Sequence, residues 1–296
     1  MRFCEADPVL VVSTVNVNGL RAAVRKGMLG WLEQRRPDVL CLQEVRAPHG
    51  AVKEALSAGS WSVAQANSPT PGRAGVAIAA RTDLTDVIQS MEAVEVSTGR
   101  WIEATIELSG GEPLAVVSAY APRGDANDDA SMAEKHAFLE GALERLTVLR
   151  RSTSLVLLAG DLNVAHTETD LDNWRAYRRT ALFHPEVRRH LDRMFDEFGW
   201  VDLCRHLAGE GPVPFTCWSY RGPSMFERNA GGRLDYQIAT PDLAGLVRSS
   251  TVDRSPTAAL RWSDHAPVSV AFDLDLPAIN PREPTTVESC TTPILP

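Results

Sequence analysis

Several apolar runs of this 296-residue chain end in polar side chains that could act together in catalysis. These side chains are Asn16, Glu44, Tyr120, Asp161, Asn163, Asp235, Asp264 and His265. Taken singly, each has a plainer interpretation as a turn or a helix cap, because Asn and Asp bond their own backbone where a strand stops. Together they form a set of oxygen donors with one imidazole and no thiolate, and such a set favours a hard cation such as Mg²⁺.

A cation bound in this way commonly completes its coordination with phosphate oxygens, so the set predicts hydrolysis of a phosphoester. In this hypothesis Glu44 and Asp264 hold Mg²⁺, with Mn²⁺ as the alternative metal. Asp161 would deprotonate the attacking water and Asn163 would orient it. Glu44 ends the buried run LCLQE, where a carboxylate requires a partner or a metal.

The dipeptide Asp264-His265 stands before a proline and a predicted strand, where an ordinary turn is the plainer interpretation. In the phosphoester hypothesis His265 instead donates to the phosphate, and Asp235 fixes its tautomer and raises its basicity. Tyr120 supplies a further donor. The sequence contains no P-loop, GxSxG or HExxH string that would compete for the catalytic role.

Apolar runs rich in Val, Leu, Ile and Ala predict the strands that carry these side chains. The runs cover residues 9–15, 38–43, 74–80, 101–108, 114–120, 154–160, 233–240 and 266–274. We expect the polar residues at the C-terminal ends of these strands. The run WIEATIEL alternates in polarity, so we expect this segment to be half exposed. Apolar spacing of three and four predicts helices over 22–35, 130–150 and 185–198, and hence a layered α/β or α+β fold with two packed sheets.

Two segments, VVSTVNVNG and VLLAGDLNVA, share one design. Each joins an apolar strand to two polar side chains spaced by two, Asn16 with Asn18 and Asp161 with Asn163. Side chains two apart on extended backbone lie on one face. We therefore expect two related halves that present both pairs to one cleft.

Composition narrows the functional classes. With a net charge of −8, any anionic substrate must be met by a local basic patch. Five cysteines without CxxC spacing argue against a disulfide framework or zinc site and favour the reducing cytoplasm. No run approaches about 18 continuous apolar residues, so we expect no membrane partner. We expect one catalytic domain over 1–276 and a disordered tail over 277–296, which is rich in Pro, Thr and Ser.

Seven strings, in chain order, closely resemble the exonuclease III family of apurinic/apyrimidinic (AP) endonucleases. They are NVNGLR (16–21), LQE (42–44), YAPRG (120–124), GDLNVAH (160–166), FTCWSYR (215–221), GGRLDY (231–236) and SDHAPV (263–268). The resemblance runs from about Val9 to about Phe272. It implies a four-layer α/β/β/α sandwich with two mixed sheets, within the endonuclease/exonuclease/phosphatase superfamily. It also implies metal-dependent cleavage of DNA 5′ to abasic sites, with 3′-to-5′ exonuclease and 3′-end-cleaning activities.

The resemblance also assigns roles to individual residues. The implied catalytic residues are Tyr120, Asp161, Asn163, Asp235 and His265, and the metal candidates are Asn16, Glu44, Asp161, Asn163, Asp264 and His265. The candidate substrate contacts are Arg100, Arg123, Asn173, Cys217, Trp218, Arg221, Gly232 and Leu234. The implied partner is double-stranded DNA with abasic sites or with damaged or recessed 3′ ends, bound by a monomer.

Two positions depart from the family pattern. Many relatives carry an aromatic residue where this chain has Cys217 and a bulky residue where it has Gly232, and these side chains wall the pocket for the flipped-out abasic sugar. In one hypothesis Met225 or Phe226 fills the space and abasic-site activity survives. In the other, discrimination for the abasic sugar weakens, so that the enzyme acts mainly as a 3′ exonuclease or end-trimmer, or admits a sugar that still carries its base.

Two alternative functions stay open. One is a phosphatase or phosphodiesterase of the same superfamily that acts on inositol phosphates, lipid or RNA, although the strings FTCWSYR and GGRLDY favour the DNA-repair branch. The other is a DNA-binding protein without turnover, although every expected catalytic position retains its chemistry. Such a binder would retain DNA in the presence of Mg²⁺ without consuming it.

Overall fold

The computed structural model describes residues 9–91, 98–220 and 223–277, which form strands and helices throughout. The strands are β1 (Leu10–Asn16), β2 (Val39–Gln43), β3 (Ser62–Ala66), β4 (Val76–Ala80), β5 (Thr85–Ile88), β6 (Trp101–Glu107), β7 (Pro113–Tyr120), β8 (Leu155–Asp161), β9 (Val201–Asp202), β10 (Asp235–Ala239), β11 (Val247–Val252) and β12 (Val268–Phe272). The helices are α1 (Leu20–Arg25), α2 (Met28–Arg35), α3 (Ala51–Ala55), α4 (Asp129–Ser152), α5 (Trp174–Tyr177), α6 (Pro185–Asp192), α7 (Leu203–Ala208), α8 (Pro223–Glu227) and α9 (Pro241–Ala244).

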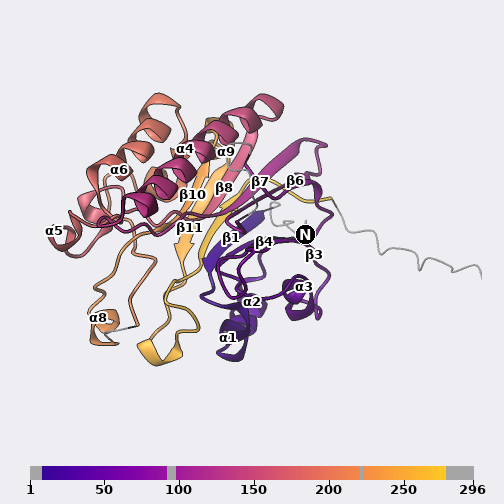
Figure 1. Cartoon of the computed structure of the whole chain (residues 1–296). Helices are drawn as coiled ribbons and strands as arrows, with labels where there is room; N and C mark the ends of the chain where they lie inside the picture. The colour runs from indigo at the N-terminus through magenta and orange to yellow at the C-terminus, as the bar shows by residue number, and fades with distance from the viewer. Residues whose placement is uncertain (1–8, 92–97, 221–222, 278–296) are drawn as a thin grey trace, which may run out of the picture.

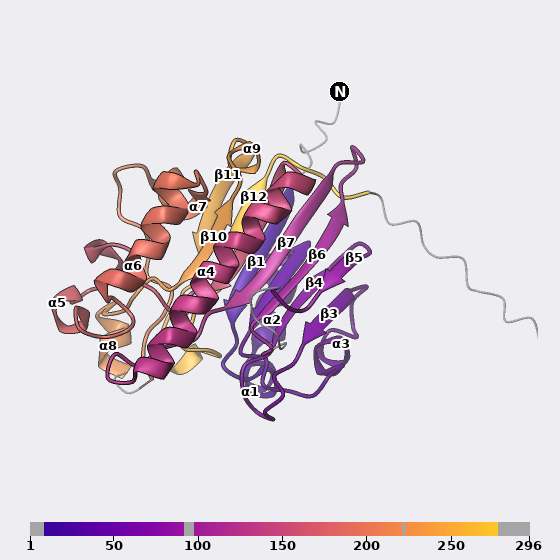
Figure 2. The ribbon, with the colours of Figure 1, turned by 45° about the horizontal axis from the view of Figure 1, so that its top comes forward.

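Two mixed sheets of six strands each pack face to face (Figure 1). Their orders are β11-β12-β1-β2-β4-β3 and β5-β6-β7-β8-β10-β9. An apolar core fills the space between them. Helices α1, α2 and α3 cover the first sheet, while α4 and α6 cover the second, as Figure 2 shows from another side. These layers confirm the expected α/β/β/α sandwich. No helix in the described ranges has the length and apolarity needed to cross a bilayer.

All eight predicted apolar runs contain a strand. The four strands that they missed, β3, β5, β9 and β11, are the edge strands of the two sheets. An edge strand buries less side-chain surface, and all four residues of β5 are exposed. The predicted helix over 22–35 is two helices, because Gly27 adopts a left-handed φ of 113°. The helix predicted over 185–198 is α6 followed by a π-helical turn at Arg193–Glu197.

The expectation that WIEATIEL is half exposed holds for the end of the run, where Thr105 is half-buried and Glu107 is exposed, and is wrong for its start. Glu103 in β6 is only 3% exposed. It accepts a hydrogen bond from the Trp101 indole at 3.0 Å and pairs with Arg145 of α4. The first polar residue of the alternation therefore belongs to an ion pair beneath α4 and does not face solvent.

The two sheets follow the same plan. Strands β1 and β2 run parallel in the first sheet, and β8 and β7 run parallel in the second. Next to these pairs, β12 is antiparallel to β1 and β10 is antiparallel to β8. On the other side, β4 is antiparallel to β2 and β6 is antiparallel to β7. The two sheets therefore share one pattern of strand directions, and each takes strands from both halves of the chain: β1 to β4 with β11 and β12 in the first, and β5 to β7 with β8 to β10 in the second.

Hydrogen bonds cross the apolar space between the sheets. Gln43 in β2 donates to the Ser118 hydroxyl in β7 at 3.0 Å. Gln237 in β10 donates to the backbone carbonyls of Val12 at 3.1 Å and Val268 at 2.8 Å, both in the first sheet. Buried polar groups require partners, so these contacts favour one relative placement of the two sheets.

A buried ion network anchors the start of β10. Arg233 is fully buried and donates to Asp170 at 2.8 Å and to Asp202 at 2.7 Å. Arg205 also pairs with Asp170, at 2.6 Å. Burial alone would raise the pKa of Asp170, but the Arg233 guanidinium holds it below its usual value. The network ties β10 to the turn at Glu168–Asp170, which follows β8.

We expect Arg233→Met to lower the free energy of unfolding by about 3–5 kcal/mol, because it leaves buried Asp202 without its cation and Asp170 with Arg205 alone. The control is Arg248→Met, which removes one partner of a surface ion pair with Asp273 and should cost at most about 1 kcal/mol. Urea unfolding at neutral pH measures both costs. Equal costs would contradict the role assigned to the buried network.

Candidate active site

A cleft of about 920 Å³ opens where strands of both sheets end. The predicted site residues that line it are Glu44, Tyr120, Arg123, Asp161, Asn163, Cys217, Gly232, Leu234, Asp264 and His265. Arg46, Leu171, Tyr177 and Arg179 also line the cleft and were not predicted. Sequence reasoning therefore found the charged centre of the cleft and missed part of its wall.

The two halves of the chain meet at the floor of the cleft. Asn16 ends β1 and Asp161 ends β8, and the Asn16 amide donates to the Asp161 carboxylate at 2.9 Å. The same amide nitrogen donates to Glu44, just after β2, at 3.0 Å. Tyr120 ends β7, and its hydroxyl donates to Glu44 at 2.6 Å. The Asn16 oxygen accepts from the backbone N–H of Asn18 at 2.9 Å, so as a metal ligand Asn16 would have to turn its amide.

Asp235 and the pair Asp264-His265 reach the cleft in a different way from that expected. Asp235 is the first residue of β10, and Asp264 and His265 precede β12. The expectation of C-terminal strand ends is therefore wrong for these three residues. Because β10 and β12 are antiparallel to β8 and β1, their N-terminal ends lie at the edge where Asp161 and Asn16 lie.

Glu44 and Asn163 both have left-handed backbone, with φ of 50° and 51°. This conformation is uncommon for residues other than glycine and is found more often at functional sites. The Asn163 N–H donates to the Asp161 side chain at 2.9 Å, and the Asn163 amide donates to the carbonyl of Ala121 at 3.0 Å. Glu44 pairs with Arg46. These contacts hold both side chains just after the C-terminal ends of β2 and β8.

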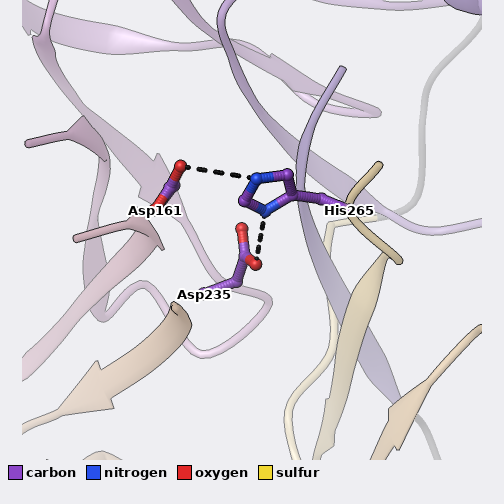
Figure 3. Close-up of side chains that lie close together, drawn as sticks. All are labelled: Asp161, Asp235 and His265. Atoms are coloured by element: carbon purple, nitrogen blue, oxygen red, sulfur yellow. Dashed lines mark hydrogen bonds and ion pairs between the residues drawn. The ribbon is translucent and has the colours of Figure 1, made fainter. Parts of the chain in front are cut away.

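His265 lies between two carboxylates (Figure 3). Its Nδ1 is 2.7 Å from Asp235, and its Nε2 is 3.8 Å from Asp161. Burial alone lowers the pKa of His265, but the carboxylates of Asp235 and Asp161 hold it well above the usual 6.5. Burial raises the pKa of Asp161. A hydrogen bond from Nδ1–H to Asp235 leaves Nε2 free to donate into the cleft.

The donor set suits a hard cation. One ligand atom from each of Asp161, Asp235 and His265 lies within 4.8 Å of the others. Asp235 already binds His265 through one oxygen, while its buried Oδ1 has no hydrogen-bond partner within the described structure. A buried oxygen of this kind indicates a further polar partner such as a cation or water. Glu44 and Asp264 add carboxylates at the same cleft, so the residues present fit Mg²⁺ or Mn²⁺.

Three predicted substrate contacts do not line the cleft. Trp218 is buried at 2% exposure and does not line the cleft. Arg100 lies over the Tyr120 ring at 4.9 Å and donates to the Tyr120 carbonyl. Asn173 is exposed at the start of α5. Arg221 lies outside the described residues.

Leu171 occupies the space beside Gly232. A Cβ built on Gly232 would lie 2.9 Å from the Leu171 side chain. Leu171 is part of an apolar cluster against which Cys217 packs. Of the two predicted fillers, Met225 lines the cleft, whereas Phe226 is buried at 1% exposure outside it. The two small residues therefore do not leave an empty gap in the wall.

Leu171, in the wall of the cleft, and Lys135, in α4, are two further residues that the sequence analysis did not single out. The contact of Leu171 with Gly232 is tertiary, and the sequence carries no signal for it. Lys135 does have a signal, because it stands in the apolar stripe of α4 with Phe138 and Leu139, three and four residues later. A cation on such a stripe indicates a buried charge with a specific role.

Known proteins resemble this chain over most of its length. The sequence pattern of the endonuclease/exonuclease/phosphatase family matches residues 13–265. An exodeoxyribonuclease of Bacillus subtilis is 33% identical over 88% of this chain and 98% of its own length. An AP endonuclease structure from Archaeoglobus fulgidus has a TM-score of 0.78 at 27% identity, covering 89% of this chain and 99% of that one. A 3′ phosphatase from Neisseria, bound to a product DNA hairpin, has a TM-score of 0.80 at 27% identity, with the same coverage of 89% and 99%.

We expect Asp235→Asn to lower the pKa of His265 toward 6.5, because it removes the carboxylate that stabilises the imidazolium. NMR titration of the histidine rings measures the change. Asp192→Asn is the control, since Asp192 contacts His166 at 2.8 Å and should leave His265 unchanged. The raised pKa also means that charged His265 stabilises the fold fully below pH 6.5, and less as the pH rises through the raised value. An unshifted pKa in Asp235→Asn would contradict this pairing.

Proposed function

The chain belongs to the endonuclease/exonuclease/phosphatase family, and we propose that it is a metal-dependent DNA repair nuclease that hydrolyses phosphodiester bonds. The single observation that carries the proposal is the cleft in which Asp161, His265 and Glu44 converge from strands of both sheets. The relatives named as an exodeoxyribonuclease and as AP endonucleases support DNA as the substrate. We propose cleavage 5′ to abasic sites, removal of 3′-terminal nucleotides, or both.

In the proposed reaction Asp161 accepts the proton of the attacking water, and Asn163 orients that water. Burial raises the pKa of Asp161, which makes its carboxylate a better proton acceptor once ionised. The backbone N–H of Asn163 bonds to Asp161, so the two groups keep a fixed relation. The water oxygen then forms a bond to phosphorus as the bond to the leaving oxygen breaks, and the leaving oxygen takes up a proton from solvent.

His265 and Tyr120 would stabilise the charge that develops on the phosphate. The His265 Nε2–H faces Asp161 across the cleft and is placed to donate to a phosphate oxygen. Burial and the Glu44 carboxylate raise the pKa of Tyr120, so its hydroxyl stays a donor. Glu44 and Asp264 would hold the metal ion, which when bound supplies positive charge beside the phosphoryl oxygens.

The acidic chain would meet DNA through local positive charge. Arg123 and Arg179 line the cleft although the net charge of the protein is −8. Binding through these guanidinium groups depends on counterion release and therefore weakens as salt is added. We also propose a monomer in a reducing cytoplasm. The free thiols of Cys41, Cys204 and Cys217 are compatible with such a compartment.

The primary test uses two end-labelled duplexes, one with an internal abasic-site analogue and one intact with a recessed 3′ end. We expect Mg²⁺-dependent cleavage of at least one, abolished by EDTA. Asp161→Asn should lower the rate at least about 100-fold, because it removes the proton acceptor. Retention of DNA with no cleavage would indicate a binding protein, and turnover only of inositol phosphates, lipid or RNA would indicate the other branch of the family.

A separate prediction concerns Leu171 in the wall of the cleft. Leu171→Ala should lower the ratio of abasic to intact cleavage about tenfold or more, because it opens the apolar wall beside Gly232. Leu191→Ala is the matched control, since Leu191 is equally apolar and buried but belongs to the core beneath α6. Rates on both duplexes give the ratio. An unchanged ratio in Leu171→Ala would contradict the idea that Leu171 takes the place of the bulky side chains that relatives carry at the positions of Cys217 and Gly232.

A further inference from the structure

Lys135 places a buried amino group directly behind the cleft. Its side chain is fully buried in α4. The ammonium donates to the backbone carbonyls of Pro122 at 3.1 Å, Arg123 at 3.1 Å and Asn163 at 2.7 Å. All three N–H bonds therefore have acceptors, and all three acceptors are neutral. None of the ion pairs between described residues involves Lys135.

Fold stability does not explain this lysine. Burial of an ammonium without a carboxylate partner is unfavourable, and replacing buried charge by an apolar side chain of similar volume is often neutral or stabilising. The neighbours of Lys135 on the inner face of α4, Phe138 and Leu139, are apolar. An apolar residue would suit this face, so the role of Lys135 lies in the segments that its ammonium joins.

The joined segments both carry predicted catalytic or substrate-contacting groups. Pro122 and Arg123 belong to the loop after β7, and Arg123 lines the cleft. Asn163 belongs to the turn after β8, where its left-handed backbone presents its carbonyl to Lys135. On the cleft side, the Asn163 amide already donates to Ala121 of the same loop at 3.0 Å. On the side away from the cleft, Lys135 forms a second connection between the loop after β7 and the turn after β8.

Gly124 provides an independent observation. It has a left-handed φ of 74°, and a Cβ at this position would lie 2.9 Å from the Cδ of Lys135 and 2.8 Å from the Cβ of Ala181. The loop therefore passes the lysine stem at a distance that leaves no room for a side chain. The backbone of residues 122–124 is shaped around Lys135.

We propose that Lys135 is a positioning residue, whose ammonium holds the phosphate-contacting loop at Arg123 against the turn that carries Asn163. The proposal rests on the proposed function, since it assigns what the two segments position. Removal of the three donors frees the loop and the turn to move relative to each other. Misplacement of such groups by about 1 Å can lower a catalytic rate about 100-fold.

The test compares Lys135→Met with the wild-type chain under single-turnover conditions, with saturating DNA and Mg²⁺. Methionine keeps the apolar stem and removes the donors. We expect the rate to fall about 10- to 100-fold, with a smaller change in DNA affinity. Leu146→Ala is the control on the same helix, because Leu146 is fully buried and lies about 16 Å further along α4 than Lys135; its rate should stay within about twofold of wild type.

Two further variants separate positioning from stability. Lys135→Arg retains a cation with donors and should recover part of the lost rate, which a defect of folding alone would not predict at equal folded fraction. If Lys135→Met does not fold, Lys135→Leu, which also lacks donors, gives the same comparison. A folded Lys135→Met or Lys135→Leu that cleaves at the wild-type rate would overturn the proposal.

Hydrogen exchange tests the connection without any activity. Peptides covering 121–124 and 161–165 should exchange at least about tenfold faster in Lys135→Met than in Leu146→Ala. If wild type cleaves no DNA, the proposed function fails while this exchange still decides whether Lys135 holds the two segments. Unchanged exchange in both peptides would refute the positioning role, whatever the activity of the wild-type protein.

Discussion

The hydrogen bond between Asn16 and Asp161 joins the two sheets at the point where the cleft opens. Both residues end central strands, so their contact requires the sheets to be aligned along their length. The cross-sheet bond from Gln43 to Ser118 reinforces this alignment from within the core. A slip of one residue in either sheet would turn strand-end side chains to the opposite face. The geometry of the site is therefore set primarily by sheet packing, and the loops refine it.

Three basic side chains surround the site, and each has different partners. His265 lies between carboxylates that also serve the proposed chemistry. Arg233 satisfies two carboxylates that belong to the scaffold. Lys135 uses only backbone carbonyls. Of the three, His265 is the one that pairs with Asp161, at 3.8 Å, so the Asp161 carboxylate is not held in a short ion pair.

The fold and the charged centre of the site could be predicted because central strands are continuous apolar runs and because strand ends gather polar residues. Edge strands such as β5 were not predicted, because an exposed strand needs no apolar pattern. The prediction that Asp235 lies at the C-terminal end of its strand was also wrong, because the direction of each strand in a mixed sheet depends on how the strands are connected and paired. Leu171 could not be found, since its packing against Gly232 joins residues that the sequence separates widely.

The common plan of the two sheets makes the chain an intramolecular pseudo-dimer. In chain order β1 and β2 correspond to β7 and β8, yet the corresponding strand ends carry different groups: β1 ends in the amide of Asn16, whereas β7 ends in the phenol of Tyr120. A cleft between identical halves would offer the same groups to a nucleic-acid strand running in either direction. The chemical difference between the halves breaks this symmetry and gives the cleft a polarity of its own.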